Sequence, residues 1–301
     1  MLDLEAQSAA PRFLWLDITR RCQETCGHCY NSSGPDGSHG SMAAGDWLRV
    51  IGEARAAGVE QVTFIGGEPT LHPGLPQLVE EALRLGLTAG VFTNLVHVTP
   101  ALWELFRRPG VTLATSYYST DADEHARITG RPTHARIRAN IIRALGYGIP
   151  LRACIVRALP GQDVDGALAE LRGLGIEDVS VEDVRPFGRG QGEHGACDTG
   201  GLCGHCGRGR GAIGPDGTVT PCIMSGWLKV GSVHDTPLAS ILEGSAMAEA
   251  VAGIPAPRGA CSPDDSNDCG KTAPACSPAF SSPPPVPPQP RGVPVLIGGR
   301  A

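Results

Sequence analysis

The stretch Phe13-Leu-Trp-Leu-Asp-Ile18, followed closely by Cys22-Gln-Glu-Thr-Cys26-Gly-His-Cys29, decides the fold and the first candidate site. Its first part is a short apolar run with strand character, and its second part is a loop with the spacing C-x₃-C-x₂-C. Three thiolates on one short loop can bind three irons of a cubane iron–sulfur cluster and leave the fourth iron without a protein ligand. A structural cluster or a closed zinc site would normally take four ligands, so the pattern indicates an iron–sulfur site with one open iron.

Strand-like and helical segments alternate along the chain after this stretch. Apolar runs with strand character lie at residues 13–18, 62–65, 89–93, 111–118, 150–156 and 178–184. Apolar residues recur at helical spacing in residues 44–57, 75–85, 100–107, 133–147 and 164–174. Six such units predict a parallel sheet with helices outside it. A complete eight-fold barrel usually needs about 250 residues, so we expect an α/β fold built as a partial (β/α)6 TIM-like barrel.

The composition of the chain changes after Arg185-Pro186, where Gly, Arg, Cys and small polar residues become frequent. The segment 213–221 has the pattern of a β-hairpin with a Pro-Asp-Gly turn, and 236–252 has a helical pattern. We therefore expect a small Cys-rich domain behind the barrel. The predicted division of the chain is an N-terminal extension at 1–12, the barrel at 13–190, the Cys-rich domain at 191–280 and a Pro-rich tail at 281–301.

The composition limits the class of protein. The 301 residues carry a net charge of −6 and are 41% hydrophobic, which supports a packed core and argues against nucleic acid or an anionic membrane as a partner. No window approaches a transmembrane helix, and the N-terminus lacks the basic start and apolar stretch of a signal peptide. We therefore expect a cytoplasmic protein. Thiols stay reduced in the cytoplasm, so eleven cysteines clustered at short spacing indicate metal ligands rather than disulfides.

The cysteine loop, placed after the first expected strand, resembles the cluster loop of the radical S-adenosylmethionine (SAM) superfamily. The resemblance implies that Cys22, Cys26 and Cys29 hold a [4Fe–4S] cluster and that SAM binds the open iron through its amino and carboxylate groups. It also implies that an electron from the reduced cluster cleaves SAM to methionine and a 5′-deoxyadenosyl radical, which abstracts hydrogen from a substrate. His28 stands where the family usually has an aromatic residue, and we assign it to cofactor binding. A zinc site or a set of buried thiols is the alternative.

Gly66-Gly67-Glu68-Pro69 ends the second expected strand and matches the GGE motif of the same family, which binds the SAM amino group. Glycines let a backbone approach a ligand closely, and the carboxylate of Glu68 can accept hydrogen bonds from an ammonium group. The same four residues could form a simple turn. Their position at a strand end, one strand away from the cysteine loop, favours the SAM-binding interpretation.

Further strand ends carry side chains that the resemblance places around SAM. Thr93 and Asn94 end the third strand and Ser116 lies at the end of the fourth, in regions from which the family contacts the ribose and carboxylate of SAM. Arg152, on the fifth strand, could pair with the SAM carboxylate or serve a surface or structural role. Arg185 follows the sixth strand, in a segment that resembles the part of the family that contacts adenine.

Tyr117 and Tyr118 are candidates for lining the cavity of the barrel. Neighbouring residues of a strand point to opposite faces of the sheet, so one of the two must face outward. His72 and His97 follow the second and third strands near the same mouth of the barrel, where a substrate contact is an alternative to a plain polar role.

Cys203-Gly-His-Cys206 and Cys222 form a second group of cysteines. From Cys206 onward the spacing C-x₁₀-G-x₄-C, with Gly217 in it, resembles the opening of the SPASM and twitch domains, which hold auxiliary [4Fe–4S] clusters. The resemblance implies at least one auxiliary cluster bound by Cys203, Cys206 and Cys222. Candidates for a fourth or further ligand are Cys197, Cys261, Cys269 and Cys276.

The last three cysteines depart from the SPASM pattern. They have the spacing C-x₇-C-x₆-C rather than a tight C-x₂-C-x₅-C-x₃-C group, which puts a standard second auxiliary cluster in doubt. A structural zinc knuckle is the alternative for Cys203, Cys206 and Cys222. Cys154, within an expected strand, is predicted to be a buried thiol. A cysteine outside the clusters could also return a hydrogen atom to a substrate radical.

Three hypotheses for the function remain open. The favoured one is a maturase that cross-links a ribosomally made peptide or alters its Cα or Cβ centres, and the second is a radical epimerase or dehydrogenase acting on a sugar or aminoglycoside. The third is a non-catalytic zinc or iron–sulfur electron-transfer protein. The resemblance implies flavodoxin or ferredoxin as the electron donor. The chain begins almost directly at the first strand, without the peptide-recognition domain of many larger maturases, which weakens the peptide hypothesis and makes a separate recognition protein a candidate partner.

Overall fold

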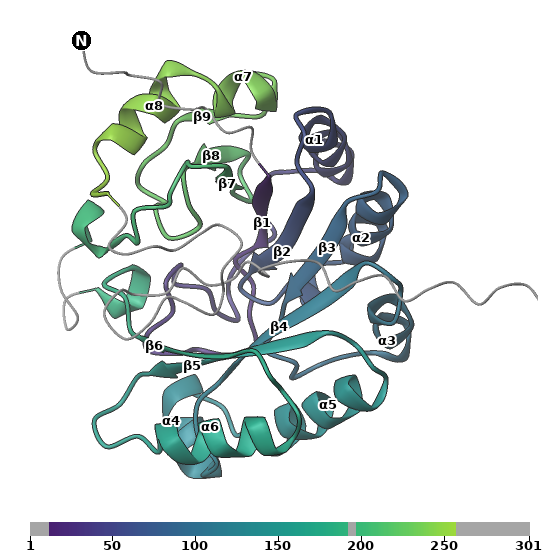
Figure 1. Cartoon of the computed structure of the whole chain (residues 1–301), viewed down its shortest axis with the longest axis vertical. Coiled ribbons are helices and arrows are strands. Elements are labelled where there is room, and N and C mark those ends of the chain that lie inside the picture. Colours follow the sequence, from purple (N-terminus) through teal and green to yellow (C-terminus); the bar gives the residue numbers. More distant parts are fainter. Residues whose placement is uncertain (1–11, 192–196, 257–301) are drawn as a thin grey trace, which may run out of the picture.

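The computed structural model describes residues 12–191 and 197–256, and one mixed β-sheet organises them (Figure 1). The strands are β1 (Phe13–Thr19), β2 (Gln61–Gly66), β3 (Thr88–Phe92), β4 (Val111–Tyr117), β5 (Leu151–Arg157), β6 (Val179–Asp183), β7 (Arg210–Ile213), β8 (Thr218–Thr220) and β9 (Gly231–Ser232). The helices are α1 (Ala44–Ala56), α2 (Leu75–Arg84), α3 (Pro100–Phe106), α4 (Ala122–Thr129), α5 (His134–Gly146), α6 (Val164–Gly173), α7 (Leu238–Leu242) and α8 (Ser245–Ala252). Within the described residues the strand order is β6-β5-β4-β3-β2-β1-β7-β8-β9.

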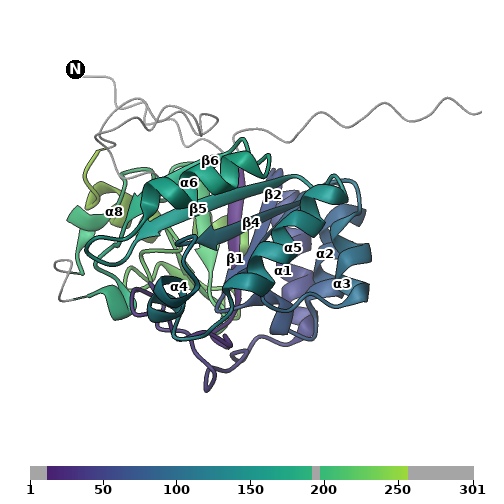
Figure 2. The same ribbon diagram turned by 90° about the horizontal axis from the view of Figure 1, so that it is seen from below.

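Strands β1 to β6 are parallel neighbours, which confirms the partial barrel expected from six strand-then-helix units. The connecting helices lie on the outside of this curved sheet (Figures 1 and 2). Because the strands are parallel, their carboxyl ends meet at one mouth, which is where the loops of a barrel build a binding site.

The alternation of side chains along β1 separates two apolar cores. Leu14 and Leu16 pack in the larger core, which the outer helices share with the sheet. Phe13 and Trp15 belong to a second core, and their ring centroids lie 4.7 Å apart. This second core also contains the fully buried Cys206, so the same strand connects the barrel to the C-terminal part of the chain.

The segment between β4 and β5 differs from the expectation of one helix at 133–147, because it contains both α4 and α5. Asp121 begins α4 by accepting hydrogen bonds from the backbone N–H groups of Asp123 and Glu124, and Gly130 ends it with a left-handed φ of 73°. Few residues of α4 are apolar. Its ends are therefore marked by capping residues rather than by an apolar pattern, and the helical periodicity is weak.

The Cys-rich C-terminal part extends the sheet of the barrel. β7 runs parallel to β1, and β8 and β9 follow in antiparallel order. The hairpin expected at 213–221 is present as β7 and β8, with Gly217 at a left-handed φ of 80° in its turn. The helical segment expected at 236–252 is divided into α7 and α8, and Gly244 lies between them.

The proposed domain boundary between residues 190 and 191 stays a prediction. Residues 1–11 of the expected N-terminal extension and the Pro-rich tail at 281–301 lie outside the described residues. In the part of the chain that the structure describes, no helix has both the length and the apolar character needed to cross a membrane.

Candidate active site

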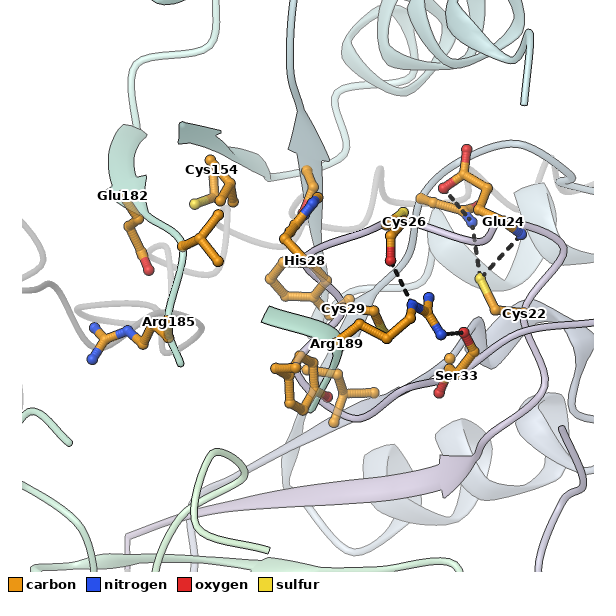
Figure 3. Close-up of a pocket in the computed structure, with 18 of the residues that line it drawn as sticks. Cys22, Glu24, Cys26, His28, Cys29, Ser33, Cys154, Glu182, Arg185 and Arg189 are labelled. Atoms are coloured by element: carbon orange, nitrogen blue, oxygen red, sulfur yellow. Dashed lines mark hydrogen bonds between the residues drawn. The ribbon is translucent and has the colours of Figure 1, made fainter. Parts of the chain in front are cut away.

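A pocket opens at the carboxyl ends of the barrel strands (Figure 3). Its empty volume, which includes open solvent at the mouth, is about 1170 Å³. The predicted site residues that line it are Cys22, Cys26, His28, Cys29, Gly66, Gly67, Asn94, Ser116 and Arg185. Four others lie outside its lining, namely Glu68, Pro69, Thr93 and Arg152.

The three cysteines of the loop line this pocket together, and none of them is in a disulfide. Cys22 is 8% exposed, and its Sγ accepts hydrogen bonds from the backbone two residues on (3.4 Å) and from Nδ2 of Asn94 (3.8 Å). Sγ of Cys29 donates to Oδ1 of Asn31 at 3.1 Å. Thiols that face one cavity from separate positions suit a cubane cluster, because each of its irons takes its own thiolate.

Two neighbouring elements hold the cysteine loop in place. The N–H of Thr25 donates to the carbonyl of Thr129 at the end of α4, at 2.9 Å. Arg189, which follows β6, donates from Nε to the carbonyl of Cys26 at 2.7 Å and from Nη1 to the carbonyl of Ser33 at 2.8 Å (Figure 3). Arg189 therefore positions the loop, although nothing in the sequence pattern connects it with the cysteines.

Gly66 and Gly67 line the pocket at the end of β2 and are pressed against the backbone at the end of β1 and just before the cysteine loop. Gly66 has a φ of 146°, and a Cβ at this residue would lie 2.3 Å from the carbonyl oxygen of Thr19. A Cβ on Gly67 would lie 2.3 Å from the carbonyl oxygen of Arg21. Close packing between two backbones therefore requires glycine at both positions, in addition to any need for a ligand to approach.

Glu68 does not line the pocket, which differs from the expectation that its carboxylate would face an ammonium group. It is fully buried, and its carboxylate accepts hydrogen bonds from Thr70, Thr93 and Asn94 at 2.7–2.9 Å. Burial raises the pKa of Glu68, and these donors oppose the rise. The side chain thus joins the ends of β2 and β3 and brings Asn94 to the pocket, with Pro69 and Thr93 behind the lining.

His28 and Tyr118 form a pair in the wall of the pocket, where Nε2 of His28 lies 3.2 Å from the hydroxyl oxygen of Tyr118. Tyr117 faces the other side of β4, where its hydroxyl lies 2.8 Å from Nε2 of His134 and donates to Glu170 at 2.6 Å. One tyrosine therefore faces the cavity and its neighbour faces the helices, as the alternation of a strand predicts.

The two predicted arginines take different places. Arg185 lines the pocket, and its Nη1 donates to the carbonyl of Gly201 at 3.1 Å, which links the barrel to the C-terminal part. Arg152 is 5% exposed and lies deeper in the barrel, with its guanidinium carbon 5.9 Å from the ring centroid of Phe92. The structure therefore does not bring Arg152 to the pocket with the other residues that we assign to SAM.

Three further carboxylate residues, Glu24, Glu182 and Asp183, line the pocket and were not assigned a role from the sequence, and Cys154, predicted only as a buried thiol, is buried and lines it too. Cys154 of β5 and Glu182 of β6 face the pocket on the side away from Cys22 (Figure 3), and burial raises the pKa of both. Glu24, inside the cysteine loop, accepts a hydrogen bond from Oγ1 of Thr133 at 2.7 Å, and burial raises its pKa to about 7. Side chains alternate between the two faces of a strand, which is why one of Tyr117 and Tyr118 was expected to face the cavity. The same argument applied to β5 could have predicted that Cys154 faces it.

The thiols of Cys22 and Cys26 are protonated in the metal-free protein at neutral pH. Burial and then the nearby carboxylate of Glu68 raise the pKa of Cys22 to about 12, and burial also raises the pKa of Cys26. Iron binds the thiolate form, so cluster binding must displace these protons.

The auxiliary cysteines lie behind one wall of the same pocket. Cys206 and Cys222 are buried in the second apolar core, and Cys197 packs against it. The two residues that follow Cys222, Ile223 and Met224, line the pocket. Cys203 is half-buried, and Cys261, Cys269 and Cys276 lie outside the described residues.

The arrangement of thiols fits a cubane cluster better than a single metal ion. Among residues 12–191 and 197–256, no three cysteine, histidine or carboxylate side chains converge closely enough to hold one ion. A cubane instead requires thiols around a cavity, and Cys22, Cys26 and Cys29 all line one cavity. The chemistry of these donors and the space between them therefore fit an iron–sulfur cluster.

The geometry defines a class of protein, a parallel partial barrel with a loop of three thiols at its mouth. The sequence profile of the radical SAM superfamily matches residues 16–171, more than half of the chain, and the SPASM profile, an iron–sulfur cluster-binding domain, matches residues 203–270. The chain therefore belongs to the radical SAM superfamily and carries a SPASM domain. These two domains imply a SAM-binding [4Fe–4S] cluster and auxiliary clusters as cofactors.

Curated relatives match part of the chain. The PqqA peptide cyclase of Streptomyces rochei is 28% identical over 183 residues, which cover 60% of this chain and 50% of the relative. The PqqA peptide cyclase of Ruegeria pomeroyi is 31% identical over 144 residues, which cover 47% of this chain and 38% of the relative. The chain thus spans about half the length, or less, of these curated relatives.

Solved structures share the fold. SuiB of Streptococcus suis bound to its precursor peptide SuiA superposes with a TM-score of 0.66 at 17% identity, covering 80% of this chain and 66% of SuiB. The structure of anSMEcpe with AdoMet and the Cp18Cys peptide superposes with a TM-score of 0.61 at 12% identity, covering 79% of this chain and 81% of that one. These likenesses show that the chain shares the overall fold of these proteins.

Proposed function

We propose that this chain is an enzyme that uses SAM radical chemistry to modify a ribosomally made peptide, by forming a cross-link or by altering a Cα or Cβ centre. The observation that carries the proposal is one pocket lined both by the loop from Cys22 to Cys29 and by Ile223 and Met224 of the SPASM part. A substrate in this pocket would lie between the SAM site and the auxiliary cysteines. Matching relatives are named PqqA peptide cyclase, which supports a peptide as the substrate class.

When bound, the cluster and SAM supply the electron and the 5′-deoxyadenosyl radical that removes a hydrogen atom from the substrate. The residues of the chain hold and shield this chemistry. The thiolates of Cys22, Cys26 and Cys29 would bind the cluster, and the backbone at Gly66 and Gly67, which lines the same pocket, would contact the amino group of SAM. The apolar walls of the pocket exclude water from the reacting centre.

The proposal includes two partners. A low-potential one-electron donor of the flavodoxin or ferredoxin class would reduce the cluster, because the reductive cleavage of SAM consumes an electron. A separate peptide-recognition protein would present the peptide. Both follow from the kind of reaction proposed rather than from a surface of the described residues.

The test is anaerobic reconstitution of the full chain with iron and sulfide, followed by incubation with SAM, a reductant and the short peptides encoded beside its gene. We expect 5′-deoxyadenosine together with a modified peptide, which is lighter by two hydrogen atoms if a cross-link forms. Cys26→Ala should abolish both products, and Cys206→Ala should retain part of the SAM cleavage but lose the peptide product. SAM cleavage that persists in Cys26→Ala, or a peptide unchanged in mass and stereochemistry, contradicts the proposal.

A second candidate is a radical epimerase or dehydrogenase that acts on a sugar or aminoglycoside. Cys154 favours an epimerase, because its thiol lies in the pocket on the side away from Cys22 and is 5% exposed. A thiol so placed can return a hydrogen atom to the opposite face of a substrate radical. In D₂O an epimerase should place one solvent-derived deuterium in the product, whereas a product without deuterium excludes it.

A further inference from the structure

The outer edge of β6 is open in the part of the chain that the structure describes. β6 pairs with β5 on one side, and no strand within residues 12–191 and 197–256 pairs with it on the other. At the other end of the barrel, β1 is covered by β7 (Figure 1). An uncovered strand presents unpaired N–H and C=O groups, which are complementary to the backbone of an extended peptide.

The register of β6 against β5 determines which backbone groups point to the open edge. Ala153 donates its N–H to the carbonyl of Asp178 and is paired with Val179. In a parallel ladder every second residue bonds to the same neighbour, so Ser180 and Glu182 use their backbone groups toward β5. The residues whose backbone groups face the open edge are Val179, Val181 and Asp183.

The side chains of β6 alternate between the helices and the pocket. Val179 and Val181 pack against the outer core. Ser180 and Glu182 point into the barrel, and no nitrogen or oxygen of the described residues makes a hydrogen bond with the buried Oγ of Ser180 or Oε1 of Glu182. The thiol of Cys154, a weak donor, faces them. A strand added outside β6 would place every second side chain next to these two polar atoms.

The open edge leads to the proposed reaction centre. The N–H of Arg189, six residues after the end of β6, donates to the carbonyl of Cys29 at 2.9 Å, so the segment that follows β6 is bonded to the cysteine loop. Glu182 lines the pocket from the β6 side, and Met224 of the SPASM part lines it as well. A side chain delivered beside Glu182 would therefore enter the pocket between the cysteine loop and the SPASM part.

We propose that the substrate peptide adds to β6 as an extended strand and places alternate side chains toward the inside of the barrel, beside Ser180 and, in the pocket, beside Glu182. This inference rests on the proposed function, because it takes the substrate to be a peptide. Arg185 and Arg152 already act on the charge of Glu182, so the buried Oε1 of Glu182 favours a side chain with a hydrogen-bond donor, rather than one of a particular charge, at the position next to it. The competing occupant of the edge is β6 of a second copy of the chain.

The first experiment selects short peptides from a displayed random library on the full, reconstituted chain with SAM present. One selected peptide is then resynthesised with a methyl group on one backbone nitrogen at a time. We expect affinity to fall by about tenfold at every second position, because only alternate N–H groups of the peptide face β6. Failure to select any peptide, or losses without a period of two, overturns the proposal. This scan leaves the protein unchanged, so it does not depend on the folding of a variant.

A second experiment compares Val181→Pro with Val181→Ala. Both remove the valine side chain from the outer core, but only proline removes the N–H that faces the open edge, and proline is tolerated at such edge positions. We expect the selected peptide to bind Val181→Pro about tenfold more weakly than Val181→Ala. Equal affinities overturn the proposal.

Two further readouts separate this inference from its alternatives. Sedimentation that shows a dimer of the unmodified chain, lost in Val181→Pro, would assign the edge to a second copy and overturn the proposal. Mass spectrometry of the bound peptide after reduction reports the proposed function independently. Period-two binding without chemical change refutes peptide modification but supports the edge, whereas modification without period-two binding refutes the edge alone.

Discussion

At the scale of single residues, the path of the cysteine loop depends on groups outside the cysteine motif. Arg189 bonds the carbonyls of Cys26 and Ser33, and Gly67 lets the end of β2 approach the carbonyl of Arg21 in a space too small for a Cβ. Neither residue binds iron through its side chain. Each fixes the backbone that carries the three thiols.

Arg189→Gln should weaken the hold of the chain on its cluster. The change removes two hydrogen bonds donated by a charged group, which are stronger than neutral ones. We expect a chelator to remove iron from the reconstituted variant about tenfold faster than from the unmodified chain, measured by the loss of cluster absorbance. Arg84→Gln, which breaks only an exposed pair with Glu81 on α2, is the control and should lose iron at the original rate. Equal rates for the two variants would show that Arg189 does not position the loop.

Gly67→Ala should disturb the SAM side of the pocket. The new Cβ would lie 2.3 Å from a backbone carbonyl oxygen, so either β2 or the cysteine loop must move. We expect SAM cleavage to fall by about tenfold or more, measured as 5′-deoxyadenosine formed per cluster. Gly52→Ala on α1 meets no atom within 4 Å and should keep the original rate. A Gly67→Ala variant with full cleavage would contradict the close packing described here.

The sequence alone was sufficient to identify the candidate site residues that lie close together along the chain. Three cysteines on one loop and a glycine pair at a strand end could be assigned because their neighbours in sequence are also their neighbours in space. The role of Glu68 could not be assigned from the sequence, because two of its hydrogen-bond donors, Thr93 and Asn94, lie at the end of another strand. The position of Arg152 outside the pocket lining could not be predicted either, because the sequence does not show at which residue of β5 the lining begins.

At the scale of elements, α4 connects the cysteine loop to the helices. Its last residue, Thr129, accepts the N–H of Thr25, and its buried His125 lies with its ring 5.5 Å from that of Tyr118. Nε2 of His125 is 3.3 Å from Oγ1 of Thr133, which in turn bonds Glu24 in the pocket. The packing of α4 therefore affects Tyr118 and Glu24, two residues that line the pocket.

Acidification should destabilise the metal-free protein through His125. Burial, and then the neighbouring His134, lower the pKa of His125 to about 4, below the value of about 6.5 expected in an unfolded chain. The unfolded chain then binds more protons between these values, so the free energy of unfolding is lost as pH falls through this range, by about 3 kcal/mol for this group. Urea unfolding near pH 7 and near pH 4 should show a smaller loss for His125→Gln. An identical pH dependence in both proteins would contradict this assignment.

The elements themselves were largely predictable, with α4 and the division of residues 236–252 into α7 and α8 as the exceptions. The longer helices and the parallel strands carry clear apolar periodicity, and their bounds agree closely with the expected ranges. α4 buries few residues, so its apolar signal is weak, and its capping residue Asp121 is the signal that could have located it.

At the scale of the whole molecule, β1 pairs with the barrel on one side and with the SPASM hairpin on the other. A Cys-rich domain behind the barrel was expected from composition. The pairing of β1 with β7 could not be predicted, because these two strands are far apart in the sequence. Their register depends on how the whole second apolar core packs.

The continuous sheet predicts that the barrel and the SPASM hairpin unfold together. Loss of β7 would expose the edge of β1 and the buried Trp15, so neither part should open alone. Hydrogen exchange of the full chain should give amides of β3 and of β7 the same free energy of opening, and both should fall by the same amount in a destabilising core variant such as Val62→Ala. Separate free energies that respond independently would indicate two folding units.

The central claim is that three thiolates hold a cubane cluster whose remaining iron binds SAM. It is tested most directly by electron paramagnetic resonance of the reduced, reconstituted full chain carrying Cys206→Ala and Cys222→Ala, which isolates the cluster of the barrel, recorded with and without SAM. We predict a [4Fe–4S]⁺ signal whose g values shift when SAM is added and which is lost when Cys26→Ala is introduced. A signal that is the same with and without SAM would contradict the account.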